Sequence, residues 1–175
     1  MKSDLLVDVL AVQADEMVER YDKDIALLSM EGLDTVFINK LQQQMKHADR
    51  TKVFSSTQYN ASQMTSILRS LDLLVTSRYH AGVLSLHSHV PQTAIGHDLR
   101  IKDFYSDLDI PELYVDHEDP DRYKVLHDNV EALFNHYNTI KTKLQKGYAW
   151  YLELEKRNVP LLRAFLEANF SEWLD

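Results

Sequence analysis

Residues 72–98 read DLLVTSRYHAGVLSLHSHVPQTAIGHD, and their pattern predicts one strand-helix-strand unit. Short apolar runs at 72–77 and 92–96 predict two β-strands, because each is bounded by polar or turn residues. The segment between them, residues 81–90, predicts a helix. A strand, a helix and a second strand in this order form a right-handed crossover, in which the two strands run parallel.

The same alternation continues on both sides of this stretch. Strands are predicted at 24–30, 52–56 and 113–116, and the first (DIALLSM) is apolar without a break, as in a strand buried on both faces. Helices are predicted between them, including one capped by Asn60 or Ser62 and one at 100–108. The sequence therefore predicts an α/β fold: a doubly wound, Rossmann-like parallel sheet with helices on both faces.

The two ends of the chain depart from this alternation. The chain opens on a helix where such domains usually open on a strand, so we expect a first strand, and with it an N-terminal domain, to be absent from this sequence. From residue 121 onward only helical patterns occur: one stripe ends before Gly147, and Pro160 is expected to start a closing helix. We therefore expect a Rossmann-like domain at residues 1–120 and a helical tail at 121–175 that packs on it or on a partner.

Composition narrows the classes of partner. The chain has 175 residues, with 27 acidic and 19 basic side chains, for a formal net charge of −8. An acidic surface is a poor match for nucleic acid or for an anionic membrane, so neither partner is expected. There is no cysteine and no apolar run of about 18 residues that would span a bilayer. With no signal peptide recognised at the start, we expect a cytoplasmic protein.

One predicted strand end carries the residues best suited to chemistry. Ligands of open α/β sheets bind beyond the carboxyl ends of the strands, and Ser77, Arg78 and His80 follow the strand at 72–77. Arg78 can hold a carboxylate or phosphate in a forked pair, and His80 can act as an acid or a base near neutral pH. If the backbone stays extended through Tyr79, both side chains point the same way. In the alternative interpretation, the arginine pairs with a neighbouring acid and the histidine packs at the helix start.

Other motifs are weaker or missing. Arg100 follows the strand at 92–96 and can line the same cleft, or simply begin a helix of mixed charge. The chain has four glycines and no dinucleotide-binding, Walker or nucleophile-elbow motif. His87 and His89 are spaced so that they point to different faces of a helix, so we expect no metal and no cofactor.

The stretch from 72 to 98 resembles the C-terminal motif of the polysaccharide pyruvyl transferases. The matching residues are Ser77, Arg78, His80, Ala81, Val90, Pro91 and Asp98. The order of elements around the motif extends the resemblance over most of residues 1–140. The sequence departs from the family at three positions: His97 replaces the usual Tyr, Arg100 the usual Lys, and His89 a Gly that commonly precedes Val-Pro.

The resemblance implies a GT-B-like enzyme that transfers the carboxyethylidene group of phosphoenolpyruvate onto two hydroxyls of a sugar in a cell-surface or extracellular polysaccharide. Its partners are then phosphoenolpyruvate and a saccharide acceptor. The resemblance implies Arg78 and His80 as the donor-binding pair, and we expect Ser77, Asp98 and Arg100 to belong to the same substrate site. His80 is the catalytic candidate, and it either transfers a proton or only holds the donor. This chain resembles only the C-terminal half of such an enzyme.

Two other functions remain open at this stage. A GT-B-like glycosyltransferase domain would bind a nucleotide sugar, with Arg78 on the diphosphate. A non-catalytic domain would use the aromatic C-terminal helices for association, either with another copy or with an N-terminal domain.

Overall fold

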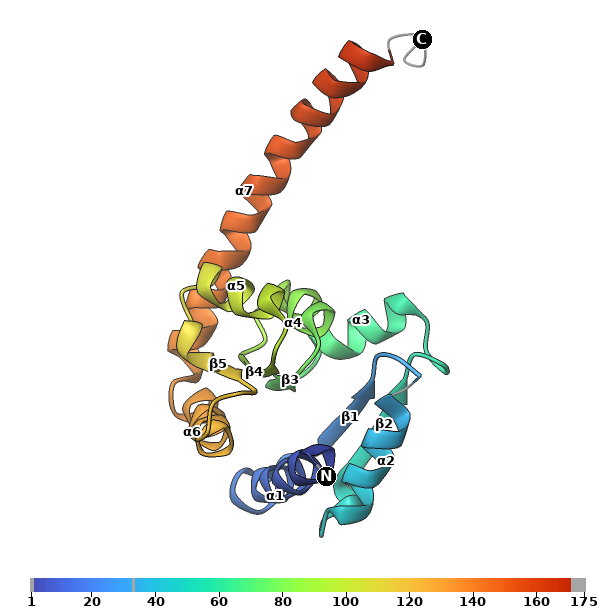
Figure 1. Cartoon of the computed structure of the whole chain (residues 1–175), viewed down its shortest axis with the longest axis vertical. Helices are drawn as coiled ribbons and strands as arrows, with labels where there is room; N and C mark the ends of the chain where they lie inside the picture. The colour runs from blue at the N-terminus through green and yellow to red at the C-terminus, as the bar shows by residue number, and fades with distance from the viewer. Residues whose placement is uncertain (1, 33, 171–175) are drawn as a thin grey trace.

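The structure is a computed structural model that describes residues 2–32 and 34–170 (Figure 1). Its helices and strands alternate through most of the chain. They are α1 (Lys2–Tyr21), β1 (Ile25–Ser29), α2 (Asp34–Gln44), β2 (Thr51–Ser55), α3 (Ala61–Arg69), β3 (Leu74–Thr76), α4 (Tyr79–Leu86), β4 (Gln92–Gly96), α5 (Leu99–Asp107), β5 (Tyr114–Asp116), α6 (Arg122–Asn135) and α7 (Tyr137–Asn169), with short 3-10 helices at Ala48–Arg50 and Pro111–Leu113.

The expected α/β class is confirmed. Every strand pair in the described residues is parallel, and α1, α2 and α6 lie on one side of the strands while α3, α4 and α5 lie on the other (Figure 1). Local sequence accounts for where the elements start. The predicted cap of α3 is Asn60, whose side chain accepts a hydrogen bond from the Gln63 backbone, while the Gln63 side chain accepts one from the Asn60 backbone.

The strands do not form one continuous sheet. β1 pairs with β2 in register from Ile25 opposite Thr51, and β3, β4 and β5 form a second sheet in that order. The two sheets are not joined by strand pairing in the described residues. The strand order is therefore β2-β1, a break, and β3-β4-β5.

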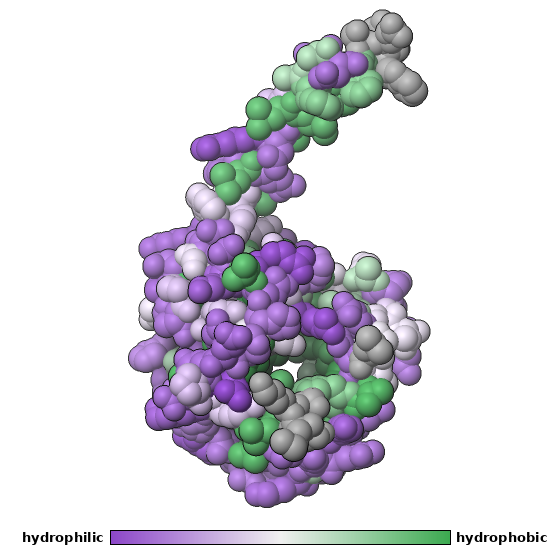
Figure 2. All heavy atoms as spheres, in the orientation of Figure 1, coloured by the Kyte–Doolittle hydropathy of each residue, from purple (hydrophilic) through white to green (hydrophobic). Residues whose placement is uncertain are grey.

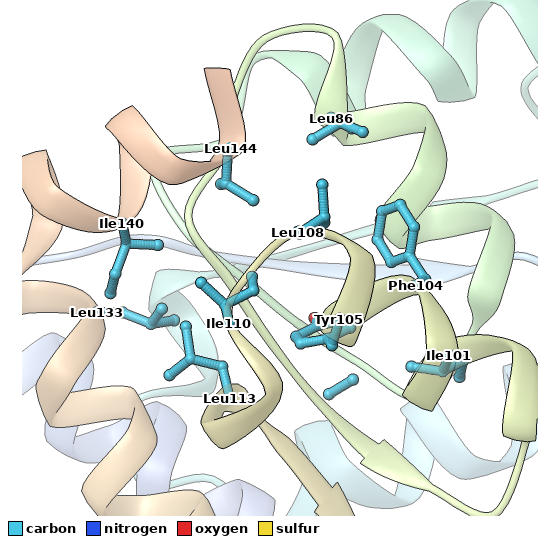
Figure 3. Close-up of a cluster of buried hydrophobic side chains, with 11 residues drawn as sticks. Leu86, Ile101, Phe104, Tyr105, Leu108, Ile110, Leu113, Leu133, Ile140 and Leu144 are labelled. Carbon is cyan, nitrogen blue, oxygen red and sulfur yellow. The ribbon is translucent and has the colours of Figure 1, made fainter. Parts of the chain in front are cut away.

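Each sheet has a main hydrophobic core of its own, and a further cluster joins them, because Leu28 of β1 packs against the cluster that contains Leu74 of β3. The larger one lies under β4 and brings together side chains from α4, α5, α6 and α7, among them Leu86, Phe104, Leu108, Leu133 and Leu144 (Figure 3). The smaller one joins α1 and α2 to β1 through residues such as Val7, Leu27 and Leu41. Helix α1 connects the two halves, because Leu6 and Leu10 also pack against the cluster around Ile95 and Val115.

The C-terminal region corrects two expectations. We expected a helix to end before Gly147 and another to begin at Pro160, but α7 runs through both residues without a break. Gly147 is buried where α7 packs against Leu108, and this close approach leaves no room for a side chain, because an added Cβ would lie 2.3 Å from Leu108 Cδ2. The glycine thus serves close packing rather than helix termination. The predicted division into residues 1–120 and 121–175 stays a prediction.

Only the first part of α7 packs on the rest of the molecule. Ile140, Leu144 and Gly147 are buried, whereas the distal half projects away as a single helix (Figure 1). Large apolar side chains on this projection are exposed, including Val159, Leu161 and Phe165. In the described part of the chain, no helix is both long and apolar enough to cross a membrane.

Candidate functional site at the carboxyl ends of the strands

Arg78 lies where the two sheets face each other. It follows β3 and turns toward the carboxyl end of β1, where its guanidinium forms ion pairs with Asp34 and, at 3.4 Å, with Glu31. The hydrogen bond from Arg78 Nη2 to Asp34 Oδ1 raises the pKa of the guanidinium further above its usual value. Arg78 therefore carries a full positive charge, and its side chain is 41% exposed.

Asp34 is itself held in place by the backbone. Its Oδ2 atom accepts hydrogen bonds from the backbone N–H groups of Met30, at 3.1 Å, and Glu31, at 3.0 Å. The carboxylate thus closes the turn after β1 and begins α2 while its other oxygen faces Arg78. Asp34 was not among the site residues predicted from the sequence. Its position at a strand end and helix start was the signal that could have placed it at the site.

The turn after β3 differs from our expectation. Helix α4 begins at Tyr79 rather than Ala81, so the backbone is not extended through Tyr79 and this premise was wrong. The Thr76 hydroxyl fixes the turn by accepting a hydrogen bond from the Arg78 backbone N–H at 2.9 Å. Arg78 is the residue that precedes the helix, in an extended conformation. The arginine and the histidine are therefore not related by the two-residue repeat of a strand.

Tyr79 connects the remaining predicted residues. Its ring packs edge-on against the exposed His80 imidazole, with centroids 5.6 Å apart, and the guanidinium of Arg100 lies 5.3 Å from its centroid. Ser77 is exposed. His80 and Arg100 thus share Tyr79 as a neighbour, whereas Arg78 is directed toward Asp34.

Asp98 and Arg100 form a pair after β4. Asp98 precedes α5 and accepts a hydrogen bond from the Arg100 backbone at 3.0 Å and one from Arg100 Nη2 at 2.7 Å. This pairing with Arg100 lowers the pKa of the Asp98 carboxyl. Asp98 is therefore ionised and capping the helix, while the Arg100 side chain remains 67% exposed.

The break between the sheets contains a cavity of about 600 Å³, which we call the β1–β3 slot. Residues of β1, β3 and α1 line it, for example Leu27, Val75 and Gln13, and Asp34, Ser77 and Arg78 are also among its lining residues. Figure 2 shows the corresponding hollow in the globular part, with hydrophobic side chains around it. His80, Asp98 and Arg100 are not part of the lining, although they follow the same ends of the sheet strands.

The site residues do not include a metal centre. Within residues 2–32 and 34–170, no three histidine or acidic side chains converge in a group that could hold a metal ion. What the arrangement offers is an ionised arginine beside a cavity, a helix start with its free N–H groups, and an exposed imidazole one residue further on. Such a set is suited to binding a small anion.

Parallel strands flanked by helices define an α/β domain, in which Arg78 stands at the carboxyl end of β3. The sequence profile of the family described as polysaccharide pyruvyl transferase matches residues 4–98, more than half of the chain and the part that contains Ser77, Arg78 and His80. The chain belongs to this family. In the same comparisons no curated protein and no solved structure matches it.

Proposed function

We propose that this chain binds phosphoenolpyruvate at the carboxyl end of β3 and serves a pyruvyl transferase that forms a cyclic ketal on a sugar of a cell-surface or extracellular polysaccharide. The observation that carries the proposal is Arg78, which is charged, partly exposed and beside the β1–β3 slot within the segment that matches the family. Phosphoenolpyruvate has a carboxylate and a phosphate, and a guanidinium forms forked pairs with both.

The electrostatics at Arg78 leave room for such an anion. Asp34 is fixed by two backbone hydrogen bonds, but the Glu31 side chain is 61% exposed and its contact with Arg78 is the longer of the two ion pairs. An exposed ion pair of this kind contributes little, about 0–1 kcal/mol. An incoming carboxylate or phosphate can therefore replace Glu31 while Asp34 continues to orient the guanidinium.

The chemistry needs a proton at one carbon of the donor. The methylene carbon of phosphoenolpyruvate gains one proton, and the oxygens of two sugar hydroxyls bond to the adjacent carbon as its bond to the phosphate oxygen breaks. One of the two hydroxyl protons balances the proton gained by carbon, and the other leaves with inorganic phosphate. His80 is the titratable side chain of the motif that is exposed next to Arg78, so we assign it the proton transfer. Ser77, Asp98 and Arg100 complete the proposed donor site, with Asp98 and Arg100 holding the start of α5 beside Tyr79.

Binding rather than turnover tests this proposal, because the acceptor sugar is unknown. Isothermal titration with phosphoenolpyruvate is expected to show binding to the unaltered chain and a loss of at least tenfold in affinity for Arg78→Ala. The matched control is Arg50→Ala. Arg50 also pairs with two aspartates and is similarly exposed, at 35%, but it lies next to the amino end of β2.

Two results would contradict the proposal. Equal binding of phosphoenolpyruvate to the unaltered chain and to Arg78→Ala removes the site assignment. Binding of a UDP-sugar without binding of phosphoenolpyruvate assigns the domain to the glycosyltransferases instead. A titration of His80→Ala separates the two roles, since donor affinity is expected to persist if the imidazole moves a proton and to fall if it only holds the donor.

A further inference from the structure

The strands on either side of the β1–β3 slot run side by side in the same direction. Lys23 precedes β1 and forms an ion pair of 2.7 Å with Asp72, which precedes β3. At the opposite end, Arg78 follows β3 and pairs with Asp34 and Glu31, which follow β1. Because both pairs of like ends are joined across the slot, β1 and β3 are parallel to each other.

Both strands present an unpaired edge to the slot. In the described residues, β1 has only β2 as a strand partner and β3 has only β4. Alternate residues of a parallel strand direct their N–H and C=O groups to opposite neighbours, so half of these groups on β1 and on β3 face the slot. Buried backbone groups are normally hydrogen-bonded, so two facing strand edges whose N–H and C=O groups have no strand partner are exceptional.

The sequences of β1 and β3 are those of interior strands. Ile25 to Leu28 and Leu73 to Val75 are apolar without a break, a pattern found where both faces of a parallel strand are covered. The outer strands differ: β2 carries an exposed lysine and β5 is short and ends in an exposed aspartate, as is usual at sheet edges. Yet Ile25, Ala26 and Leu28 are only partly buried, and all three line the slot.

A buried amide also lacks a partner at the slot. Gln13, on α1, is 4% exposed and lines the cavity, and neither its Nε2 nor its Oε1 atom makes a hydrogen bond. Leaving such a group unsatisfied costs about 1–3 kcal/mol. A peptide backbone in the slot would offer the donor and acceptor that this amide needs.

The strand order indicates which element of a complete sheet the slot would hold. A common doubly wound sheet has the order 3-2-1-4-5-6, with its first strand between the second and the fourth. Removing that first strand and renumbering the others gives 2-1, a break, and 3-4-5, which is the order observed here. The slot occupies the position of that central strand.

We propose that the β1–β3 slot binds one extended, apolar strand supplied by a partner polypeptide, parallel to β1 and β3 and about as long as the five residues of β1. A small apolar ligand would leave both backbone edges unpaired. A second copy of the chain would have to offer β2 or β5, whose charged edge residues do not match the apolar lining. The bound strand joins the two sheets into one, and its carboxyl end lies between Glu31 and Arg78. This inference stands on the slot alone and does not depend on the proposed donor.

A tethered strand tests the inference directly. The segment Val-Ile-Val-Ile-Val is fused ahead of the chain through a Gly/Ser linker of about 15 residues, whose mean span of about 20 Å lets it reach the slot. The tether supplies a local concentration in the millimolar range. Hydrogen exchange of the slot-facing amides of β1 and β3 is then expected to slow at least tenfold, without addition of phosphoenolpyruvate.

Two proline controls make the result specific. Proline at the odd positions of the added segment removes the N–H groups that it donates to one neighbouring strand, and proline at the even positions removes those that it donates to the other. Because a central strand does not tolerate proline, each control is expected to bind the slot weakly and to lose the protection of the β1 and β3 amides. Equal exchange in the unmodified chain, the fusion and both controls overturns the proposal. It is also overturned if the unmodified chain protects these amides in a concentration-dependent way at the mass of a dimer, because the occupant is then a second copy. Failure to bind phosphoenolpyruvate would leave these exchange results unchanged, so the two proposals fail separately.

Discussion

Replacing Gly147 by alanine tests how closely α7 packs on α5. An added Cβ at this position would lie 2.3 Å from Leu108 Cδ2 and 3.5 Å from Leu108 Cα. Leu108 is 1% exposed and lies among the side chains of the larger core (Figure 3), so it has little space to move. Overpacking of a core costs about 1–3 kcal/mol. Alanine in place of glycine within a helix regains about 1 kcal/mol, so we expect Gly147→Ala to destabilise the protein by about 0–2 kcal/mol.

The effect of Gly147→Ala on stability should change sign once the Leu108 side chain is shortened. Leu108→Ala by itself deletes the colliding atoms and is expected to cost about 2–5 kcal/mol as a large-to-small change in a core. In that background, Gly147→Ala no longer collides and keeps its helical gain, so it should stabilise by about 1 kcal/mol. The coupling between the two positions is therefore about 1–3 kcal/mol.

Urea unfolding followed by circular dichroism of the four proteins in this cycle gives the coupling directly. The matched control is Leu113→Ala, because Leu113 is equally buried in the same core but is not among the atoms that a side chain at Gly147 would meet. Gly147→Ala should keep its original effect in the Leu113→Ala background. The packing argument is refuted if Gly147→Ala changes the free energy of unfolding by the same amount with Leu108 and with Ala at position 108.

Two further substitutions test single residues by unfolding experiments. His89 has a positive φ of 55°, a conformation that costs a residue other than glycine about 1–2 kcal/mol. Glycine at this position would avoid that cost but lose about 0.5–1 kcal/mol through its greater chain entropy in the unfolded state. His89→Gly should therefore stabilise the protein by about 0.5–1 kcal/mol. Burial lowers the pKa of His89 below 6.5, so the native protein loses stability as the pH falls below 6.5. The stability gained by His89→Gly should therefore grow at lower pH, and a gain that is independent of pH would contradict this. Tyr105→Phe removes a hydroxyl that donates a hydrogen bond to Gln92 Oε1 at 3.2 Å, and both side chains are fully buried. This substitution should lower the free energy of unfolding by about 1–3 kcal/mol. An unchanged urea midpoint would show that this hydrogen bond contributes nothing to stability.

The position of His89 also explains one departure from the family motif. The family commonly has glycine before Val-Pro, and His89 adopts the left-handed backbone that favours glycine. The turn between α4 and β4 therefore places a residue other than glycine in a backbone conformation that favours glycine.

The candidate site was predictable only in part. The position of Arg78 and His80 after a strand followed from the apolar run at 72–77 and the helix after it, which local patterning specifies. Asp34, the principal partner of Arg78, lies 44 residues earlier in the chain. No periodicity joins two such positions, because their contact depends on how the two sheets face each other.

The helical tail shows the same limit. Gly147 and Pro160 are residues that often end or begin helices, and the local pattern therefore predicted two boundaries that do not exist. At Gly147 the reason for the glycine is a contact with Leu108, which only the packing of α7 on α5 creates.

Local patterning was enough to predict the strands and helices between residues 24 and 116, the parallel direction of the strands and the position of Arg78 at a strand end, because hydrophobic periodicity and capping residues act within a few positions along the chain. The open slot between β1 and β3, and the contact of Arg78 with Asp34 beside it, arise from tertiary packing. Strand pairing and burial are satisfied by residues that are distant in sequence. The apolar pattern of β1 predicts that the strand is covered, but it does not identify the polypeptide that covers it.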